Sequence, residues 1–323
     1  MTKAIRIHAH GGPEVMRWED VPSPDPGPGE ALVRHAAIGL NFIDVYFRTG
    51  FYKTNLPAIL GMEASGTVAA VGPGVTAVAV GDRVAYATAP IGAYATERVI
   101  NAERLVRLPD NIDFNTGAAM MLQGITAQYL LHRTYKVQPG ETILVHAAAG
   151  GVGLILTQWA RHLGVSVIGV VSTPEKAELA RANGADHVVV GYADLVTEVR
   201  RFTGGAMVPV VYDSVGKDTF MTSLDCLAPL GMMVSYGNAS GPVGPIDVGL
   251  LGAKGSLYLT RPGLATYTAK RADLERSAQD LFAVVGSGAV RIRVNQTFPL
   301  QEAAQAHEAL EARRTTGSTI LLP

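Results

Sequence analysis

Hydrophobic and polar positions change their spacing along the chain. Before about residue 120, short apolar or alternating runs are separated by Pro/Gly-rich stretches, such as PSPDPGPGE at 22–30 and GPG at 72–74. Runs of this length between turn residues are typical of β-strands. They predict a β-rich first part of the kind that closes into a small barrel. The expected strands are 30–36, 64–71, 83–87 and 94–100.

Between residues 122 and 262, short apolar segments alternate with stretches of helical spacing. One such stretch is 174–184, which begins with Pro and ends with Gly. Short apolar strands joined by helices indicate α/β architecture with a parallel, doubly wound sheet. The expected strands are 141–147, 165–171, 187–190, 208–213, 231–236 and 256–260. After this sheet, the pattern predicts helices near 270–287 and 301–313 and a strand at 318–322.

The segment from Gly140 to Arg161, GETILVHAAAGGVGLILTQWAR, contains a buried strand, a small-residue turn and a helix in immediate succession. Gly150 lets the backbone approach a pyrophosphate, and Gly153 lets the helix pack closely on the strand. Ala148 stands where the usual fingerprint has its first glycine. The N–H groups and the dipole at the start of the helix bind phosphate without a charged side chain. The segment predicts a dinucleotide site, and a tight loop without a ligand is the alternative.

The end of the second strand of this sheet bears on which dinucleotide is bound. Sites for NAD carry Asp or Glu about 20 residues after the glycines, where the carboxylate accepts hydrogen bonds from the ribose. Here Ser172 and Thr173 occupy this place, Lys176 follows, and Tyr192 comes after the next strand. A 2′-phosphate would meet a cation and no carboxylate, so NADPH is expected. The alternative is helix chemistry alone, with Thr173 as N-cap and Lys176 solvated.

Composition excludes several other classes of function. The chain has 323 residues, of which 48% are hydrophobic and 17% charged, and its net charge of −1 offers no general attraction to nucleic acid. The single Cys226 excludes an intrachain disulfide and a cysteine-cluster zinc site and fits a reducing compartment. The N-terminus lacks the apolar core of a signal peptide, and no apolar run reaches the roughly 20 residues of a membrane span. We expect a cytoplasmic protein that does not insert into membranes.

The glycine-rich segment also resembles a known family, the quinone oxidoreductase/zeta-crystallin group of the medium-chain dehydrogenases/reductases. The residues that match its signature are Gly140-Glu141, Leu144, Ala148-Ala149-Gly150-Gly151, Gly153, Gln158 and Arg161. The similarity continues in HGGPEV at 10–15, NFID at 41–44 and VVYDSVG at 210–216.

This resemblance implies a GroES-like β-barrel domain joined to a Rossmann domain. The first part of the GroES-like catalytic domain would be 1–121, the Rossmann domain 122–262, and the segment that returns to the catalytic domain 263–323.

Zinc-dependent relatives hold their metal with a Cys in a GxCxxD segment and a His in a GHE segment. This chain has Asn41 and Met62 at those places, and neither side chain replaces a ligand of a catalytic zinc. The eight histidines are scattered and form no ligand pattern with a carboxylate. No metal is therefore expected, and Asn41 is expected to act as a neutral polar group.

Without a metal to hold an alkoxide, the chemistry must suit an acceptor that takes a hydride readily. Reduction of a quinone or an activated enone gives an anion with delocalised charge, which a hydrogen-bond donor or water can protonate. The sequence therefore predicts an NADPH-dependent, zinc-independent quinone oxidoreductase. A 2-alkenal or enone reductase on the same scaffold is the nearer alternative. A non-catalytic NADPH-binding protein, crystallin-like or RNA-binding, is the more distant one.

Candidate site residues follow from the resemblance and from the predicted strand ends, where open α/β sheets bind their ligands. In the family, the segment with Asn41, Asp44 and Tyr46 borders the nicotinamide, and Tyr52 is close in sequence, so these four are the catalytic candidates. The resemblance also implies that Arg313 reaches the 2′-phosphate. For any one tyrosine, a half-buried core position is the alternative. The coenzyme-binding candidates are Asn41, Phe42, Tyr46, Gln123, Thr126, Tyr129, Ala149, Gly150, Gly151, Val152, Ser172, Thr173, Lys176, Tyr192, Ser214, Tyr236, Gly237, Asn238, Gly263, Leu264 and Arg313.

The last strand of the doubly wound sheet, at about 256–260, is uncharged and follows a glycine. An uncovered apolar sheet edge invites pairing with a copy of itself. We therefore expect a homodimer whose sheet continues across a two-fold axis.

Overall fold

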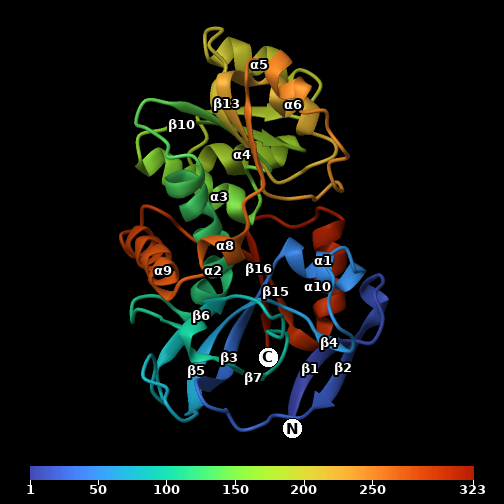
Figure 1. Ribbon diagram of the computed structural model, residues 1–323, viewed down its shortest axis with the longest axis vertical. Coiled ribbons are helices and arrows are strands. Elements are labelled where there is room, and N and C mark those ends of the chain that lie inside the picture. Colours follow the sequence, from blue (N-terminus) through green and yellow to red (C-terminus); the bar gives the residue numbers. More distant parts are fainter. The chain divides into compact units, whose positions relative to one another are not determined.

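The computed structural model describes residues 1–323, and the chain divides into two compact units (Figure 1). Unit 1 comprises Met1–Ile125, Thr268–Gly286 and Ile292–Pro323, and unit 2 comprises Thr126–Tyr267 and Ser287–Arg291. The domain limits expected from the sequence stay a prediction. None of the helices is both long and apolar enough to cross a membrane.

Unit 2 is built on a six-stranded sheet in the order β11-β10-β9-β12-β13-β14. Every neighbouring pair is parallel, which confirms the predicted doubly wound sheet. Strand order reverses beside β9, the point at which such sheets open a crevice at their carboxyl ends. The strands are β9 (Thr142–His146), β10 (Ser166–Val171), β11 (His187–Val190), β12 (Val208–Asp213), β13 (Leu227–Ser235) and β14 (Tyr258–Thr260).

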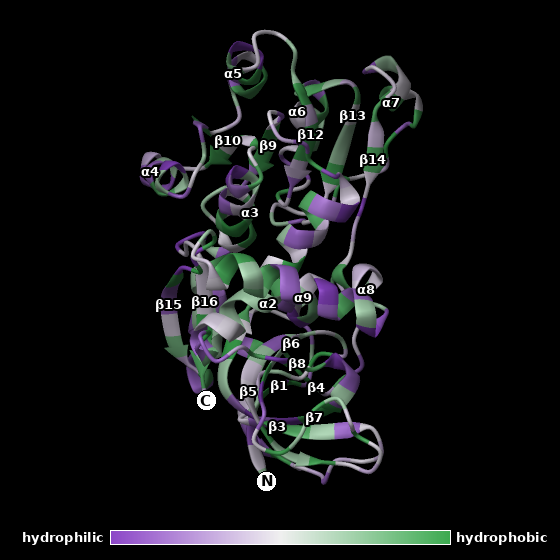
Figure 2. Cartoon of the chain, turned by 90° about the vertical axis from the view of Figure 1, so that its left-hand side faces the viewer, coloured by the Kyte–Doolittle hydropathy of each residue, from purple (hydrophilic) through white to green (hydrophobic).

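Helices connect and cover these strands. They are α3 (Gly151–His162), α4 (Pro174–Ala182), α5 (Leu195–Phe202), α6 (Phe220–Asp225), α7 (Gly249–Ala253) and α8 (Leu264–Tyr267). Helix α3 contacts β9 and β10, and α4 contacts β10 and β11, whereas α5 and α6 contact each other. Right-handed crossovers on either side of the reversal put these two pairs on opposite faces of the sheet. Figure 2 shows hydrophobic colour along β9 and β10, as expected for strands covered on both faces.

Three elements of unit 2 begin two or more residues away from the expected start: β13 and α3 begin earlier, and β14 begins at Tyr258 and not at 256. Strand β13 begins at Leu227 and not at 231, and it includes Pro229 and Gly231. The register between β12 and β13 shifts between Val208 and Val210, and this irregularity accommodates the proline. The small-residue turn was expected to extend to Gly153, but helix α3 already begins at Gly151, because Gly150 has the extended backbone of an N-cap.

Unit 1 contains a seven-stranded sheet with the path β15-β16-β3-β5-β6-β8, in which β7 also pairs with β3, and a three-stranded sheet, β2-β1-β4. A buried core that includes Ile5, Ile38, Tyr86 and Leu321 lies between them. The strands are β1 (Thr2–Ile7), β2 (Met16–Val21), β3 (Glu30–Leu40), β4 (Ala58–Ile59), β5 (Glu63–Val71), β6 (Arg83–Ala87), β7 (Glu97–Asn101), β8 (Val106–Arg107), β15 (Val294–Pro299) and β16 (Ser318–Leu322). The β-rich first part and the closing strand at 318–322 are thus confirmed.

Strand β7 begins at Glu97, whereas the pattern placed its start at 94. The three preceding residues form hydrogen bonds with β1 instead of β3. Tyr94 O accepts from Ile5 N at 2.8 Å, and Thr96 N donates to Lys3 O at 2.9 Å. The chain therefore pairs first with β1 and only then with β3, a change of partner that periodicity does not reveal.

Four longer helices complete the fold. They are α1 (Phe42–Thr49), α2 (Phe114–Tyr129), α9 (Arg271–Gly286) and α10 (Ala303–Glu311), with a π-helical turn at Leu130–Thr134 after α2 and single 3₁₀ turns at Pro13–Val15, Ala102–Arg104 and Leu300–Glu302. Helix α1 ends at Thr49 and is capped by Gly50, whose φ of 80° is left-handed and therefore favours glycine. The helices predicted near 270–287 and 301–313 are confirmed.

Helix α10 is joined to α1 by a buried arginine. Arg48 is 1% exposed; its Nη2 donates to Glu311 at 2.8 Å, and its Nε donates to Gly11 O at 3.1 Å. Its Nη1 donates to His307 Nδ1 at 3.0 Å, so His307 is neutral, with its proton on Nε2 facing Tyr94 Oη at 3.1 Å. Burial and the neighbouring guanidinium lower the pKa of His307 to about 3. This cluster holds the C-terminal segment against the N-terminal strands.

Replacing Arg48 with Met keeps most of the side-chain volume but leaves His307, Glu311 and the Gly11 carbonyl without their donor. We expect Arg48→Met to lower the free energy of unfolding by about 3 kcal/mol, because the three acceptors lose their hydrogen bonds and His307 Nδ1 is left unpaired in the interior. Arg107→Met is the matched control, because the Arg107–Asp82 pair is on the surface and Arg107 is 62% exposed; it should cost less than about 1 kcal/mol. Urea unfolding at neutral pH measures both, and equal losses would contradict the role given to Arg48.

Candidate functional site

The turn between β9 and α3 brings the helix very close to the strand. Ala147 has a left-handed φ of 51°. A Cβ on Gly153 would collide with the Ala147 carbonyl oxygen and lie 2.8 Å from Ala148 Cα, and a Cβ on Gly150 would lie 3.2 Å from the same oxygen. Gly150 has no side chain that could cap the first N–H groups of α3. The turn therefore presents backbone donors without a capping side chain, the arrangement that binds a pyrophosphate in such sheets.

Most coenzyme-binding candidates of unit 2 follow the carboxyl end of a strand. They are Ala149 and Gly150 after β9, with Gly151 and Val152 opening α3, Ser172 and Thr173 after β10, Tyr192 after β11, Ser214 after β12, Tyr236, Gly237 and Asn238 after β13, and Gly263 and Leu264 after β14. The carboxyl ends of parallel strands lie at one edge of the sheet, so the fold brings these residues to the same edge. Thr126 and Tyr129 lie on α2, and Tyr129 stacks on Tyr267 with the ring centroids 4.3 Å apart.

The residues after β10 were expected either to bind the 2′-phosphate or to cap a helix. Thr173 is the N-cap of α4, as the sequence predicts, and its hydroxyl accepts from Lys176 N at 3.3 Å. Ser172 and Thr173 still put no carboxylate directly after the strand. Glu175, in the first turn of α4, is exposed, and a hydrogen bond from Thr173 lowers the pKa of its carboxylate. The use of Lys176 in binding stays a prediction.

An aspartate that the sequence analysis did not single out organises the turn after β12. Asp213 is fully buried; its Oδ1 accepts from Val215 N at 2.7 Å and from Gly216 N at 3.1 Å, and its Oδ2 accepts from Thr219 Oγ1 at 2.7 Å. These bonds fix the turn that carries Ser214. An acidic residue at the end of the apolar run VPVVYD was the available signal.

In unit 1, Asn41 follows β3 and is the N-cap of α1. Its Nδ2 donates to Glu63 Oε2 at 2.6 Å, and its Oδ1 accepts from Gln123 Nε2 at 3.2 Å. Met62, at the position of the second zinc ligand of zinc-dependent relatives, is 6% exposed. The chain has no group of three or more His, Cys, Asp or Glu side chains that could hold a metal ion. The amide of Asn41 is thus engaged with an acid and another amide.

Two buried carboxyl groups lie beside Asn41. Asp44 Oδ2 accepts from Asn41 N at 2.9 Å and from Tyr94 Oη at 3.0 Å, while its Oδ1 has no hydrogen-bond partner. Burial raises the pKa of Asp44 to about 7 and that of Glu63 to about 8. At neutral pH both groups can therefore hold a proton. Glu63 was missed as a site residue, although it is an isolated acid in the apolar stretch from 58 to 71.

The tyrosine candidates of unit 1 belong to an aromatic group at the end of α1. The ring of Tyr46 lies 5.2 Å from that of Tyr52, 5.4 Å from Phe42 and 5.3 Å from Phe51. Phe51 is 44% exposed, so the group reaches the surface of the unit. Arg313 follows α10 with a left-handed φ of 58°. The roles of these residues stay predictions.

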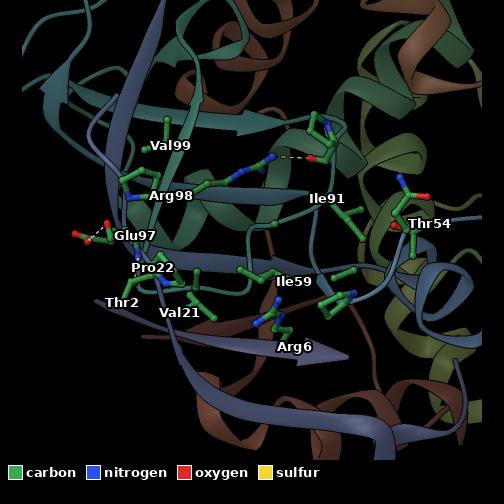
Figure 3. Close-up of a pocket in the computed structure, with 18 residues that line it drawn as sticks. Thr2, Arg6, Val21, Pro22, Thr54, Ile59, Ile91, Glu97, Arg98 and Val99 are labelled. Carbon is green, nitrogen blue, oxygen red and sulfur yellow. Dashed lines mark hydrogen bonds between the residues drawn. The ribbon is translucent and has the colours of Figure 1, made fainter. Parts of the chain in front are cut away.

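Unit 1 also has a cavity of about 600 Å³ that none of the candidate residues lines. Figure 3 shows Arg6, Arg98 and Ile91 around it. Arg98 Nη2 donates to Pro90 O and Ser23 Oγ donates to Glu97, while Arg98 Nη1 is buried without a hydrogen-bond partner. Because its lining includes no candidate residue, the cavity is separate from the candidate site.

Comparisons with known proteins agree with this architecture. The family described as "Alcohol dehydrogenase GroES-like domain" matches residues 27–139, and the family described as "Zinc-binding dehydrogenase" matches 151–268. A quinone oxidoreductase of Pseudomonas aeruginosa is 55% identical, and the match covers 100% of both chains. A 2-haloacrylate reductase of a Burkholderia species is 48% identical, with 100% of this chain and 99% of that protein covered. The crystal structure of Escherichia coli quinone oxidoreductase complexed with NADPH has a TM-score of 0.97 at 47% identity and covers 99% of this chain and 100% of that one.

A GroES-like β-domain together with a dinucleotide-binding parallel sheet defines a medium-chain dehydrogenase/reductase. Within that class, the identities above, over the full length of the chain, show that it belongs to the quinone oxidoreductase family. The expected family and fold class are thereby confirmed. The matched family description mentions zinc, but Asn41 and Met62 stand where zinc-dependent members have ligands.

Proposed function

We propose that the protein is an NADPH-dependent, zinc-independent quinone oxidoreductase. The observation that carries this function is the combination of a bare backbone turn at Gly150–Gly153 with an amide, Asn41, in place of a metal ligand. The quinone oxidoreductases among the similar proteins, one of them in complex with NADPH, support the same reaction and coenzyme. The uncharged end of β10 and the cation of Lys176 favour a coenzyme with a 2′-phosphate.

The reaction consumes NADPH, a proton and a quinone and yields NADP⁺ and a hydroquinone. NADPH, when bound, supplies a hydride from its nicotinamide ring. The residues of unit 1 proposed to act on the acceptor are Asn41, Asp44, Tyr46 and Tyr52. Asn41 offers an amide N–H to the oxygen on which negative charge develops, and protonated Asp44 has a proton to give at neutral pH. The delocalised charge of the reduced quinone makes a metal unnecessary.

A reductase of activated alkenes is the second candidate. The similarity to a 2-haloacrylate reductase, at 48% identity over the whole chain, favours it. Hydride addition to an alkene conjugated with a carbonyl gives an enolate, which needs the same hydrogen-bond donor and the same proton. Only rates with different acceptors separate the two candidates.

Two finer assignments belong to the same proposal. The domains are proposed to be 1–121 and 263–323 for the catalytic domain and 122–262 for the Rossmann domain. A cytoplasmic location is proposed because one buried cysteine suits a reducing compartment. Fractionation of cells that express the protein at native level tests the location.

The first test measures NADPH oxidation with a naphthoquinone, a benzoquinone, a 2-alkenal, a 2-haloacrylate and no acceptor. We expect kcat/KM to be highest for a quinone, and we expect activity to be unchanged by a chelator because no step uses a metal. Zinc content by elemental analysis is the control. One equivalent of zinc per chain, with activity lost on its removal, would refute the proposed chemistry, and a faster alkene reaction would select the second candidate.

The second test concerns coenzyme selection. Lys176→Ala should weaken NADPH binding by about 1 to 3 kcal/mol, the range for a charge-assisted hydrogen bond, and leave NADH binding unchanged. Lys136→Ala, which removes another exposed lysine of unit 2, is the control and should change neither affinity. Titration by calorimetry measures both coenzymes. Equal losses for the two would mean that Lys176 does not bind the 2′-phosphate.

The third test concerns a homodimer formed through β14. This strand is at the edge of its sheet, and Tyr258 and Leu259 are 58% and 37% exposed. An uncharged edge of this kind favours strand pairing between two copies, and a lysine on the edge opposes it. Sedimentation at micromolar concentration should give a dimer for the unchanged protein and for the control Val80→Lys, and a monomer for Leu259→Lys. A monomer without any substitution would exclude the dimer.

A further inference from the structure

A line of hydrogen-bonded side chains passes through the interior of unit 1 and ends at Glu63. The hydroxyl of Ser318 donates to Gln123 Oε1 at 2.7 Å, and Gln123 Nε2 donates to Asn41 Oδ1 at 3.2 Å. Asn41 Nδ2 donates to Glu63 Oε2 at 2.6 Å. The four side chains are 2%, 7%, 5% and 0% exposed in this order, so water does not replace these bonds. Each of the three hydrogen bonds runs from a donor to an acceptor nearer to Glu63. An ionised Glu63 requires this direction, because a carboxylate can only accept.

The far end of this line has a second acceptor within reach. Ser318 Oγ lies 3.0 Å from the backbone oxygen of Ala119 as well as 2.7 Å from Gln123 Oε1. A hydroxyl has a single hydrogen and can donate to only one of them at a time. The other oxygen of Glu63, Oε1, accepts from Leu122 N at 2.8 Å and can keep this bond in either protonation state.

These acceptors allow a second arrangement with every donor still satisfied. A neutral Glu63 carries one O–H, which can donate to the Asn41 oxygen once that amide turns over. The Asn41 NH₂ then donates to the oxygen of Gln123, and the Gln123 NH₂ donates to the Ser318 oxygen. Ser318 gives its hydrogen to Ala119 O. The amide turns exchange oxygen for nitrogen and leave the other heavy atoms in place.

We propose that Glu63 is a positioning residue for Asn41: its protonation state sets the direction of the whole line and so decides on which side Asn41 offers its second N–H. An amide NH₂ has two hydrogens, and the line uses one of them in either arrangement. The neutral form of Glu63 is the active one, because a carboxylate beside Asn41 would repel the negative charge that develops on the acceptor. This inference rests on the proposed function through the role of Asn41 as a donor.

The surroundings of Glu63 allow both protonation states. The ionisable groups that act on it are Asp44 on α1, Tyr86 on β6 and Tyr94 in the loop before β7. Burial raises the pKa of both tyrosines, so they stay neutral. Helix α2 and strand β16 carry no Asp, Glu, Lys, Arg or His, and β3 faces Glu63 with Gly39. Burial raises the pKa of Glu63 to about 8, so the hydrogen bonds of the line should reverse their direction just above neutral pH.

The test is the pH dependence of kcat at saturating NADPH and quinone, from roughly pH 6 to 10, a range that spans the titration of a group near 8. An acid is neutral below its pKa, so kcat should fall by about ten-fold as pH rises through it, the effect of losing one positioning hydrogen bond. Glu63→Gln keeps a donor and an acceptor at every pH, so its kcat should lack the step near pH 8 and should keep only the fall near pH 7 that ionisation of Asp44 causes. Glu97→Gln is the control, because it neutralises another glutamate of unit 1, one that accepts from Ser23. This variant should keep the step in kcat near pH 8.

A second measurement needs no acceptor and therefore separates this inference from the proposed function. In protein labelled with ¹⁵N-asparagine, the Asn41 side-chain signal is the one that Asn41→Ala lacks. In the free protein it should shift with a midpoint near pH 8, and in Glu63→Gln it should show no change near pH 8. A kcat profile without a step near pH 8, an Asn41 signal that does not move near pH 8, or a step near pH 8 that persists in Glu63→Gln would each overturn the proposal. If the protein reduces no quinone but the Asn41 signal titrates, the positioning stands and the proposed function fails.

Discussion

The removal of ionisable side chains from water governs how the segments of unit 1 come together. Arg48, Asp44 and Glu63 are almost completely buried. An unpaired buried charge costs several kcal/mol, so each of these groups requires partners supplied by other segments or a change of protonation state. Arg48 finds His307 and Glu311 on α10. The return of the C-terminal segment to the N-terminal sheet is therefore an electrostatic requirement as well as a packing one.

The same constraint shapes the chemistry beside Asn41. In zinc-dependent relatives a cation at this place would keep neighbouring carboxylates ionised. Here an amide replaces a ligand, and without a cation the buried acids Asp44 and Glu63 hold their protons to higher pH. Loss of the metal ligands thus changes two properties together: it removes a Lewis acid and it creates proton-carrying groups. Both suit an acceptor that accepts hydride without help and then needs a proton.

Unit 2 is built to bind an anion, and its turn does so with almost no charged side chains. Close packing of α3 on β9 at Gly153 brings the start of the helix against the turn, where backbone N–H groups can face phosphate. Asp213 stabilises the turn after β12 in a comparable way, since its carboxylate accepts backbone and hydroxyl donors. Backbone geometry supplies the positive potential here, which is compatible with a net charge of −1 for the whole chain.

The sequence by itself determined the parallel sheet, the glycine turn and the absence of two zinc ligands, because each depends on local spacing or on the identity of single residues. Apolar strand length, the small residues at 148–153, and Asn41 and Met62 can all be read without neighbours. Only the tertiary structure decided where β7 begins, since its first residues pair with β1, and which acids are buried. Glu63 has an ordinary sequence context, but it accepts from the amide of Asn41 after β3 and from the backbone N–H of Leu122 on α2. Through Asn41 and Gln123 it is also linked to the hydroxyl of Ser318 on β16. Such partners are far apart in the chain, and neither periodicity nor propensity contains information about them.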